Sequence, residues 1–367
     1  MINIQCSECG GLAGPIEWRC KTCGGSLDLV GLPLVDPASI DASDFSLWRY
    51  RAMLPVERRF SLGEGMTPLV PVELDGARFY AKLEYLNPTG SFKDRGTTTM
   101  LNHLAACGVT QVIDNSSGNA GASLAAFAAV GGMEATVFVP AATAVESKKR
   151  LIRSFGGVII ESRDYLADVY RAAEATTYAS HAWSPYFVLG QQTVAWETWE
   201  QLGQRAPDAI ATPVGHGGLF LGFYRGFKAL RDAGLIDRVP RMIAVQSAGV
   251  DPVVRGWEAN AAKPPRIQPG HSAADGILVD RPVRGRQILQ ALYDTDGFAL
   301  RVDNEAITAA RNCMRARGLM IETTSAVTAA ALPQIIERID ADADLALAFT
   351  GSGLKDIGGS KPPAAPE

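Results

Sequence analysis

The chain has 367 residues, 47% of them hydrophobic, so it is long enough to form two domains with sizeable cores. Its 35 Lys and Arg residues and 39 Asp and Glu residues give a net charge of -4. This balance excludes the basic surface that nucleic-acid binding requires, and four histidines are too few for a histidine-rich metal site. The composition therefore favours chemistry on a small molecule.

Neither a membrane span nor a secretion signal is expected. The uncharged stretch 115–133 is rich in Ser, Gly and Asn and is broken at Gly131 and Gly132. Residues 1–5 have neither a basic region nor an apolar signal core. We therefore expect a cytoplasmic protein that contacts no membrane.

Two Cys-x-x-Cys pairs lie within the first 25 residues: Cys6 with Cys9, and Cys20 with Cys23. Each pair can present two thiolates to one tetrahedral ion, and a segment this short has little core, so a metal would supply its folding energy. We predict a zinc-ribbon-like module over residues 1–30. A metal-free knuckle and a redox pair stay open as alternatives, because the 10 residues between the pairs are fewer than usual.

An irregular connector is expected over residues 31–65, and beyond it residues 87–96 read Asn-Pro-Thr-Gly-Ser-Phe-Lys-Asp-Arg-Gly. Ser91 followed by Asp94 predicts a capping box, so Lys93 is expected in the first turn of a helix. The helix dipole disfavours a cation there, which suits a lysine that is neutral or bound in an imine. The alternative is a surface lysine on an ordinary capped helix.

From residue 111 onward, strands and helices are expected to alternate. The predicted strands are 111–114, 135–139, 158–160, 209–214, 243–246 and 345–349, and the predicted helices are 120–130, 148–155, 165–177 and 219–230. This succession predicts an α/β fold with parallel sheets and helices on both faces. The tail 358–367 is expected to be disordered.

Three loops that follow predicted strands are rich in glycine or polar residues: 115–119, 215–218 and 350–353. Ligands of open α/β sheets lie outside the carboxyl ends of the strands, so the three loops are expected to converge on one ligand. Residues 212–219 place backbone amides, unobstructed by side chains, at a helix N-terminus, which is typical of a phosphate cradle. A simple tight turn is the alternative.

Residues 87–96 resemble the cofactor-lysine motif of fold-type II pyridoxal-phosphate enzymes. They are most similar to the threonine synthases, which read Pro-Thr-Gly-Ser-Phe-Lys-Asp-Arg-Gly, and the similarity extends from Thr67 to Asp356. It implies a tryptophan synthase β-like fold with two parallel-sheet domains. The large, cofactor-binding domain would comprise residues 31–95 and 196–357, the small domain 96–195. The resemblance also implies a homodimer.

Roles for individual residues follow from the same resemblance. Lys93 would form an imine with pyridoxal phosphate and then move the Cα proton. The cofactor phosphate would lie on Gly215, Gly217 and Gly218, with His216 shaping the loop. Asn119 would bond the pyridine 3'-oxygen. The Thr350 hydroxyl would meet the pyridine nitrogen and leave it largely unprotonated, which favours elimination and replacement over transamination.

A substrate carboxylate could be received by four residues that border these loops: Thr89, Ser116, Ser117 and Ala120. The alternative for the two serines is to cap the helix that begins near residue 120, and both roles can hold at once.

One position departs from the threonine-synthase pattern. Those enzymes show Asn-Pro-x-Arg-x-x-Gly-Gln, with the arginine gripping the substrate phosphate, whereas residues 184–191 read Ser-Pro-Tyr-Phe-Val-Leu-Gly-Gln. Phe187 thus replaces a bidentate anchor worth several kcal/mol. Candidates for another cation are Lys148, Lys149, Arg150 and Arg153, although such a run is usually a solvated face.

Our leading prediction is a threonine synthase that converts O-phosphohomoserine and water to threonine and phosphate. The alternative is a serine or threonine ammonia-lyase, or a β-replacement synthase, for which Phe187 makes sense because no substrate phosphate needs binding. A non-catalytic binding protein is the third possibility, and the presence of Lys93, Asn119 and Thr350 argues against it.

Overall fold

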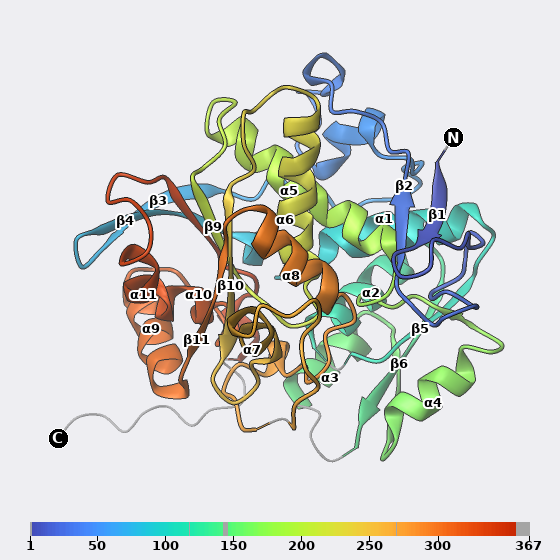
Figure 1. The fold of residues 1–367 in the computed structure, drawn as a ribbon. Helices are drawn as coiled ribbons and strands as arrows, with labels where there is room; N and C mark the ends of the chain where they lie inside the picture. The colour runs from blue at the N-terminus through green and yellow to red at the C-terminus, as the bar shows by residue number, and fades with distance from the viewer. Residues whose placement is uncertain (1, 117, 142–145, 269, 357–367) are drawn as a thin grey trace.

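Two large β-sheets organise the chain, which the computed structural model describes over residues 2–116, 118–141, 146–268 and 270–356. One sheet has six strands and the other four, and a two-stranded sheet lies near the N-terminus. Figure 1 shows β3 and β4 on one side of the molecule and β5 and β6 on the other, with α5 and α6 between them. The bounds of these elements follow.

The six-stranded sheet has the order β11-β10-β9-β12-β4-β3. Its strands are β3 (Leu69–Leu74), β4 (Ala77–Lys82), β9 (Ala209–Pro213), β10 (Arg241–Ser247), β11 (Phe298–Val302) and β12 (Leu345–Ala348). All neighbours run parallel except β3, which pairs antiparallel with β4. Every residue of β9 and β12 is buried, which explains their continuous apolar runs.

The four-stranded sheet is parallel throughout and has the order β7-β6-β5-β8. Its strands are β5 (Gln111–Asp114), β6 (Glu134–Pro140), β7 (Val158–Ser162) and β8 (Thr177–Tyr178). The helices between them are α2 (Asn119–Val130), α3 (Glu146–Ser154) and α4 (Tyr165–Ala172). Parallel strands joined by crossover helices are what the alternating sequence predicted.

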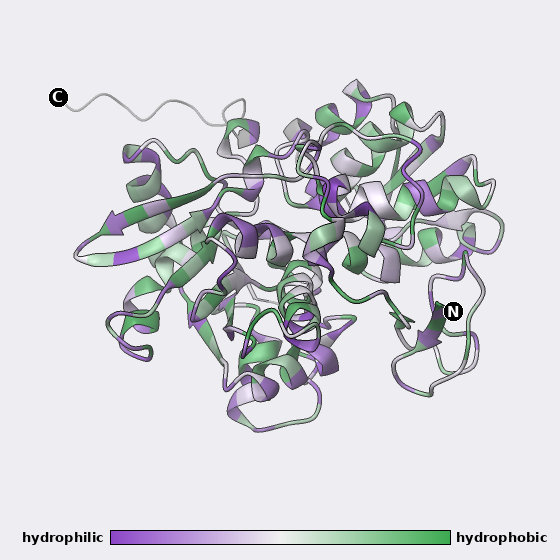
Figure 2. Ribbon diagram, turned by 90° about the horizontal axis from the view of Figure 1, so that it is seen from above, coloured by the Kyte–Doolittle hydropathy of each residue, from purple (hydrophilic) through white to green (hydrophobic). Residues whose placement is uncertain are grey.

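The remaining helices pack around the two sheets. They are α1 (Lys93–Ala106), α5 (Pro185–Gln201), α6 (Gly218–Asp232), α7 (Pro252–Glu258), α8 (Gly285–Asp294), α9 (Asn304–Ala316), α10 (Ala326–Ala330) and α11 (Leu332–Ile336). Short 3-10 helices occupy Pro37–Ser39, Leu47–Met53, Glu84–Leu86, Asp275–Ile277 and Gly353–Asp356. In Figure 2 hydrophobic and hydrophilic residues share individual helices, as expected where one face packs on a sheet.

Helix α5 was not predicted, because its sequence has no amphipathic period. Fourteen of its 17 residues are buried, so no face carries a polar stripe. Ser184 caps its N-terminus by accepting a hydrogen bond from the backbone N–H of Phe187, and Pro185 follows at the first helical position. At Gly190 a Cβ would lie 2.0 Å from the backbone oxygen of Arg95, so glycine permits the close crossing of α5 with α1.

Most predicted strands and helices are present within one or two residues of their predicted bounds. The exception is the helix predicted at 165–177, which was wrong at its end. Helix α4 ends at Ala172, and Thr177 already belongs to β8, where it pairs with Val112. Thr177 is β-branched and Tyr178 is aromatic, and both residue types favour strands. Their pairing with β5 places them in the sheet rather than in the helix.

The N-terminal segment forms a small unit of its own. Strands β1 (Asn3–Cys6) and β2 (Leu27–Val30) pair antiparallel and enclose the four cysteines. Among the described residues, no helix is long and apolar enough to cross a membrane. The domain boundaries predicted after residues 95 and 195 fall within α1 and α5, and the predicted tail 358–367 lies outside the described residues.

Candidate active site

A cavity of about 360 Å³ lies at the carboxyl ends of strands from both sheets. Its walls come from the segments that follow β5, β6, β9 and β12, together with the start of α1 and residues 275–279. The predicted site residues that line it are Lys93, Ser116, Asn119, Ala120, Gly215, His216, Gly217, Gly218 and Thr350. Thr89 is not part of the lining, and Ser117 lies outside the described residues.

Lys93 is the first residue of α1, as predicted, and its side chain is partly exposed to the cavity. Its Nζ lies 4.5 Å from the centre of the Phe92 ring and 5.8 Å from that of Phe187. Burial lowers the pKa of Lys93 to about 8, although the charges of Asp114 and Glu322 oppose this. An appreciable part of such a lysine is neutral near pH 7, and the neutral amine is the form that attacks a carbonyl carbon.

The predicted capping box at the start of α1 is wrong. The buried Ser91 hydroxyl makes no hydrogen bond among the described residues. Asp94 instead accepts hydrogen bonds from the backbone N–H of Thr89 at 2.7 Å and from its hydroxyl at 2.6 Å. Gly90 adopts a φ of 77°, and this turn presents Thr89 rather than Ser91 to the carboxylate. Thr89 therefore fixes the turn that precedes Lys93.

Residues 215–218 have the geometry of a phosphate cradle at the N-terminus of α6. Gly217 adopts a φ of 87°, and a Cβ there would lie 2.4 Å from Cδ1 of Ile288. Both facts exclude a side chain at this position, so the backbone is bare where the helix begins. Bare N–H groups at the start of a 15-residue helix fit an anionic phosphate.

His216 contributes an uncharged ring to the same loop. Burial, together with the positive charges of His181 and Lys93, lowers the pKa of His216 to about 3. Its Nδ1 accepts a hydrogen bond from the backbone N–H of Val283 at 3.5 Å. This contact ties residues 215–218 to the segment before α8, in keeping with a loop-shaping role.

Asn119 and Thr350 are each held by neighbouring polar side chains. The Asn119 amide donates to both carboxylate oxygens of Glu322, at 3.0 and 3.1 Å, and its oxygen accepts from Lys355. The Thr350 hydroxyl lies 3.1 Å from the hydroxyl of Ser325. The polar group that Thr350 presents to the cavity is therefore a neutral hydroxyl that contacts another hydroxyl.

Of the four basic residues considered as replacements for the missing arginine, Lys148 lines the cavity. Its ammonium pairs with Asp275, which also lines the cavity. The other three lie outside the lining. Lys149 and Arg153 pair with Glu161, and Arg150 is exposed to solvent. Phe187, at the predicted arginine position, is buried against Gly96 and Gly218.

A histidine in the cavity wall and an aspartate buried behind it were not predicted from the sequence. His181 follows β8 and lines the cavity, and its Nδ1 lies 2.9 Å from Oδ2 of Asp114. Asp114 is the last residue of β5. Asp114 could have been predicted as a site residue, because it is a polar residue at the end of a predicted parallel strand. His181 could not, because β8 has only two residues.

A fully buried charge network lies behind Lys93. Arg95 donates to Glu84 at 2.7 Å and to Glu197 at 2.9 Å, and Lys82 also bonds Glu197. Although burial alone would raise it, the charges of Arg95 and Lys82 hold the pKa of Glu197 down at about 2. The network joins α1 to α5 and β4 and so fixes the helix that begins with Lys93.

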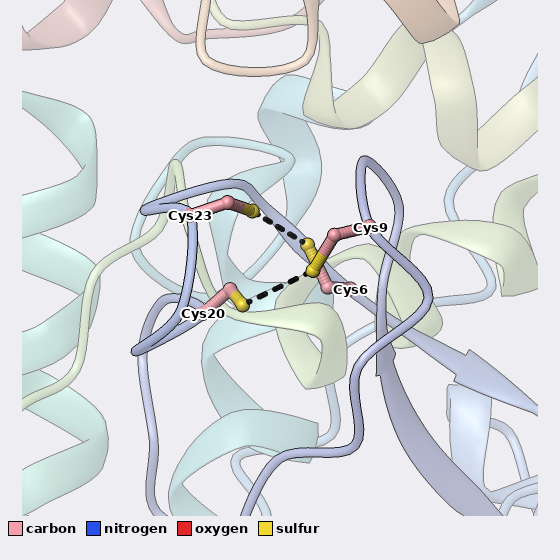
Figure 3. A group of neighbouring side chains, drawn as sticks. All are labelled: Cys6, Cys9, Cys20 and Cys23. Carbon is pink, nitrogen blue, oxygen red and sulfur yellow. Dashed lines mark hydrogen bonds between the residues drawn. The ribbon is translucent and has the colours of Figure 1, made fainter.

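The four paired cysteines meet in the N-terminal segment, as Figure 3 shows. Their sulfur atoms all lie within 4.8 Å of one another, with Cys6 and Cys23 at 3.4 Å and Cys9 and Cys20 at 3.6 Å. A tetrahedral zinc ion with Zn–S bonds of about 2.3 Å spaces its sulfurs by about 3.8 Å. All four cysteines are free thiols. The cluster therefore has the donor set and the size of a structural zinc site.

Comparison with known proteins places this geometry in a family. Residues 60–351 match the model of the family described as pyridoxal-phosphate dependent enzyme. Threonine synthases from Methanocaldococcus jannaschii and Methanosarcina acetivorans are 32% and 30% identical, over 96% and 97% of this chain and 92% and 93% of theirs. The chain therefore belongs to the pyridoxal-phosphate dependent enzymes of fold-type II and is threonine synthase-like.

Solved structures agree on the fold. The crystal structure of T.th. threonine deaminase superposes with a TM-score of 0.66 at 28% identity, covering 78% of this chain and 92% of that one. Serine racemase from Dictyostelium discoideum gives 0.67 at 25% identity over the same shares. The cofactor of this family is pyridoxal phosphate, and the bare backbone at 215–218 together with the amine of Lys93 fits it.

Proposed function

We propose that the chain converts O-phosphohomoserine and water into threonine and phosphate. The observation that carries this proposal is the similarity to two proteins named threonine synthase over 96% and 97% of the chain. The cavity supports it, because Lys93, Gly217 and Thr350 come from distant parts of the chain and line one space.

Each cavity residue has a proposed task. The amine of Lys93 would hold the cofactor and would also move the proton at the substrate Cα. Gly215, Gly217 and Gly218 receive the cofactor phosphate on their N–H groups. When bound, pyridoxal phosphate supplies an electron sink for the charge that develops on the substrate.

The ring of the cofactor would be held by two side chains. Asn119 donates toward the ring oxygen, and Glu322 and Lys355 keep its amide in place. The Thr350 hydroxyl would meet the ring nitrogen without protonating it, which would moderate the sink and favour elimination and replacement. Ser116 and the backbone of Ala120 lie where a substrate carboxylate can bind, and we propose the same for Ser117. Thr89 acts indirectly, through Asp94.

Recognition of the substrate phosphate would fall to Lys148. It lines the cavity, and its partner Asp275 holds it at the wall. The phosphate dianion of the substrate would replace the Asp275 carboxylate as the partner of the Lys148 ammonium, because the phosphate carries the higher negative charge. A single ammonium is a weaker anchor than a bidentate arginine, so we expect weaker binding of phosphorylated substrates than an arginine would give.

A second candidate is a serine or threonine ammonia-lyase, or a β-replacement synthase. The observation that favours it is Phe187, which is 1% exposed and presents an apolar ring to the cavity. An apolar ring at this place suits a small unphosphorylated amino acid. The likeness in fold to a threonine deaminase at 28% identity is compatible with this alternative.

One assay separates the two candidates. The purified protein, loaded with pyridoxal phosphate, is given O-phosphohomoserine, L-threonine, L-serine and O-phosphoserine separately, and phosphate, threonine and 2-oxoacid are measured. Release of phosphate with formation of threonine supports the synthase. Formation of 2-oxoacid from the unphosphorylated amino acids alone overturns it in favour of the lyase. Turnover of no amino acid overturns both and favours a binding protein.

We also propose that Cys6, Cys9, Cys20 and Cys23 bind a structural zinc ion. The distances within the cluster support this, because all four sulfur atoms lie within 4.8 Å of one another. The small core of the segment, a buried cluster of four residues, supports it further.

Three broader proposals complete the assignment. The six-stranded sheet forms the large domain and the four-stranded sheet the small domain, with α1 and α5 shared at their junction. The enzyme acts as a homodimer, without nucleic acid or membrane partners. It works in the cytoplasm. Size-exclusion chromatography with light scattering tests the dimer, and cell fractionation tests the location.

A further inference from the structure

One acid–base pair in the cavity wall has no task in the proposed reaction. His181 lines the same cavity as Lys93 and the loop 215–218, and its Nδ1 is 2.9 Å from Oδ2 of Asp114. The Asp114 side chain is 1% exposed, and its other oxygen has no hydrogen-bond partner among the described residues. Its carboxylate therefore has His181 as its main partner.

This pairing determines which nitrogen of His181 can do chemistry. The carboxylate accepts the proton of Nδ1, which leaves Nε2 as the atom that takes up or gives a proton. Nε2 makes no hydrogen bond among the residues that the structure describes. The nearest aromatic rings are Phe187, with centres 6.1 Å apart, and the uncharged His216, at 5.9 Å. Neither competes for the proton.

The other ionisable groups of the lining are less suited to this task; for Tyr165, burial raises the pKa of the phenol. Glu322 holds Asn119, Asp275 holds Lys148, and Lys93 is needed at the cofactor and at Cα. Elimination or hydration of an amino acid also transfers a proton to or from the side-chain oxygen. Lys93 is already assigned to the transfer of the Cα proton. His181, which lines the cavity with its Nδ1 beside Asp114, has the geometry of a second acid–base group.

We propose that His181, oriented by Asp114, is the group that carries the proton of the substrate's side-chain oxygen. The inference rests on the proposed function and applies to both of its candidates. In the synthase direction, water bonds to Cβ and its O–H bond breaks. The proton passes to Nε2, and the electron pair of the carbon–carbon double bond moves toward the cofactor. In the lyase reaction a protonated Nε2 gives its proton to the side-chain hydroxyl as the Cβ–O bond breaks, and water leaves.

The test separates chemistry at Cα from chemistry at the side chain. Cofactor-loaded parent and His181→Gln proteins receive O-phosphohomoserine or L-threonine in deuterated water, and NMR follows Cα exchange while product is assayed. Glutamine keeps a hydrogen-bonding group beside Asp114 but cannot accept a proton. We expect product formation to fall by about 10²-fold or more, while Cα exchange stays within about threefold of the parent. His271→Gln, on an exposed loop, is the matched control and should leave both rates unchanged.

Two results would overturn the proposal. Product formation that stays within about threefold of the parent removes any acid–base role for His181. A parallel fall of product formation and Cα exchange makes His181 a binding or cofactor-positioning residue instead. Inactivity of the parent toward every amino acid is a different result, because it overturns the proposed function itself.

A second variant keeps the test decisive if the glutamine protein does not fold. Asp114→Asn retains the imidazole but no longer fixes its tautomer, so product formation should fall by at least about tenfold with Cα exchange retained. Full activity of this variant would contradict the orienting role of Asp114.

Discussion

The walls of the cavity and the cysteine segment at residues 2–30 both consist largely of loops, yet different interactions hold them in place. The loops 115–118, 214–217 and 349–352 each continue a buried parallel strand, and the first two lead directly into helices. The cysteine segment has a buried cluster of four residues: Ile4, Cys6, Cys20 and Leu27. Figure 2 shows this segment at the edge of the molecule. The cavity loops are therefore positioned by the buried strands that they continue, whereas the cysteine segment has only a small core of its own.

The two regions are nevertheless connected. Trp18 stacks on Tyr170, with ring centres 5.4 Å apart, and meets Trp183 edge to face at 5.3 Å. The buried Arg284 donates to the backbone carbonyls of Leu27 and Trp183, each at 2.9 Å. The cysteine segment therefore braces the stretch that carries His181 and Phe187 into the cavity.

The largest effect is expected at Lys93. Lys93→Ala removes the amine that binds the cofactor and moves the Cα proton, so turnover should fall by at least about 10³-fold. Borohydride should no longer fix the cofactor to the denatured protein. Lys228→Ala, on the exposed face of α6, is the control and should behave as the parent. Near-parent turnover by the Lys93 variant would show that the cavity is not the site of the reaction.

A large loss of stability is expected from the charge network behind Lys93. Glu197→Gln leaves the buried Arg95 and Lys82 without full compensation and should cost about 3–5 kcal/mol in the free energy of unfolding. Urea denaturation measures this, with the exposed Glu73→Gln expected to cost less than about 1 kcal/mol. Equal costs for the two variants would contradict the role of the network.

The same network predicts a pH dependence. The folded-state pKa of Glu197 is depressed to about 2 from 4.5, so its contribution to stability is complete above pH 4.5 and is lost as the pH falls toward 2. The free energy of unfolding of the parent, measured by urea denaturation, should therefore decrease as the pH falls from 4.5 toward 2. In the Glu197→Gln protein this contribution to the decrease should be missing.

A local effect is expected in the cysteine segment. The parent should contain about one zinc ion per chain, and Cys6→Ser should lose it. Hydrogen exchange should then accelerate in residues 2–30 while β5 and β6 stay protected. Cys313→Ser, at a half-buried cysteine outside the cluster, is the control. Metal-free parent protein, or unchanged protection in the variant, would mean that packing alone orders the segment.

The smallest effect is a pH dependence of cofactor capture. The pKa of Lys93 is about 8, so about half of the amine is neutral at that pH and nearly all of it about one pH unit higher. The rate at which the apoprotein takes up pyridoxal phosphate, followed by absorbance, should reach half of its maximum near pH 8 and level off about one pH unit higher. A rate that keeps rising toward pH 10 would indicate an unperturbed lysine.

How far the sequence predicts these regions depends on how local the deciding interactions are. The start of α1 at Lys93 and the strand 111–114 follow from nearby residues, and both are confirmed. The capping box does not form because the Asp94 carboxylate accepts hydrogen bonds from the backbone N–H and the hydroxyl of Thr89 instead of pairing with Ser91. Helix α5 escapes prediction because burial on all sides removes its period.

The cavity shows the same limit. Residues carried by recognisable motifs, such as Gly217 and Asn119, are predicted and line it. His181 is not predicted, because its position depends on the two-residue strand β8 and on a contact with Asp114, 67 positions away in the chain. The loss of the arginine at Phe187 is visible in the sequence, but only the structure shows that Lys148 reaches the same cavity.

The central claim is that Lys93 carries pyridoxal phosphate in this cavity. The most direct measurement is peptide mapping by mass spectrometry after the cofactor-loaded protein is reduced with borohydride. We expect a single labelled peptide that carries the reduced cofactor on Lys93. A label on another lysine, such as Lys148 or Lys355, or no label at all, would contradict it.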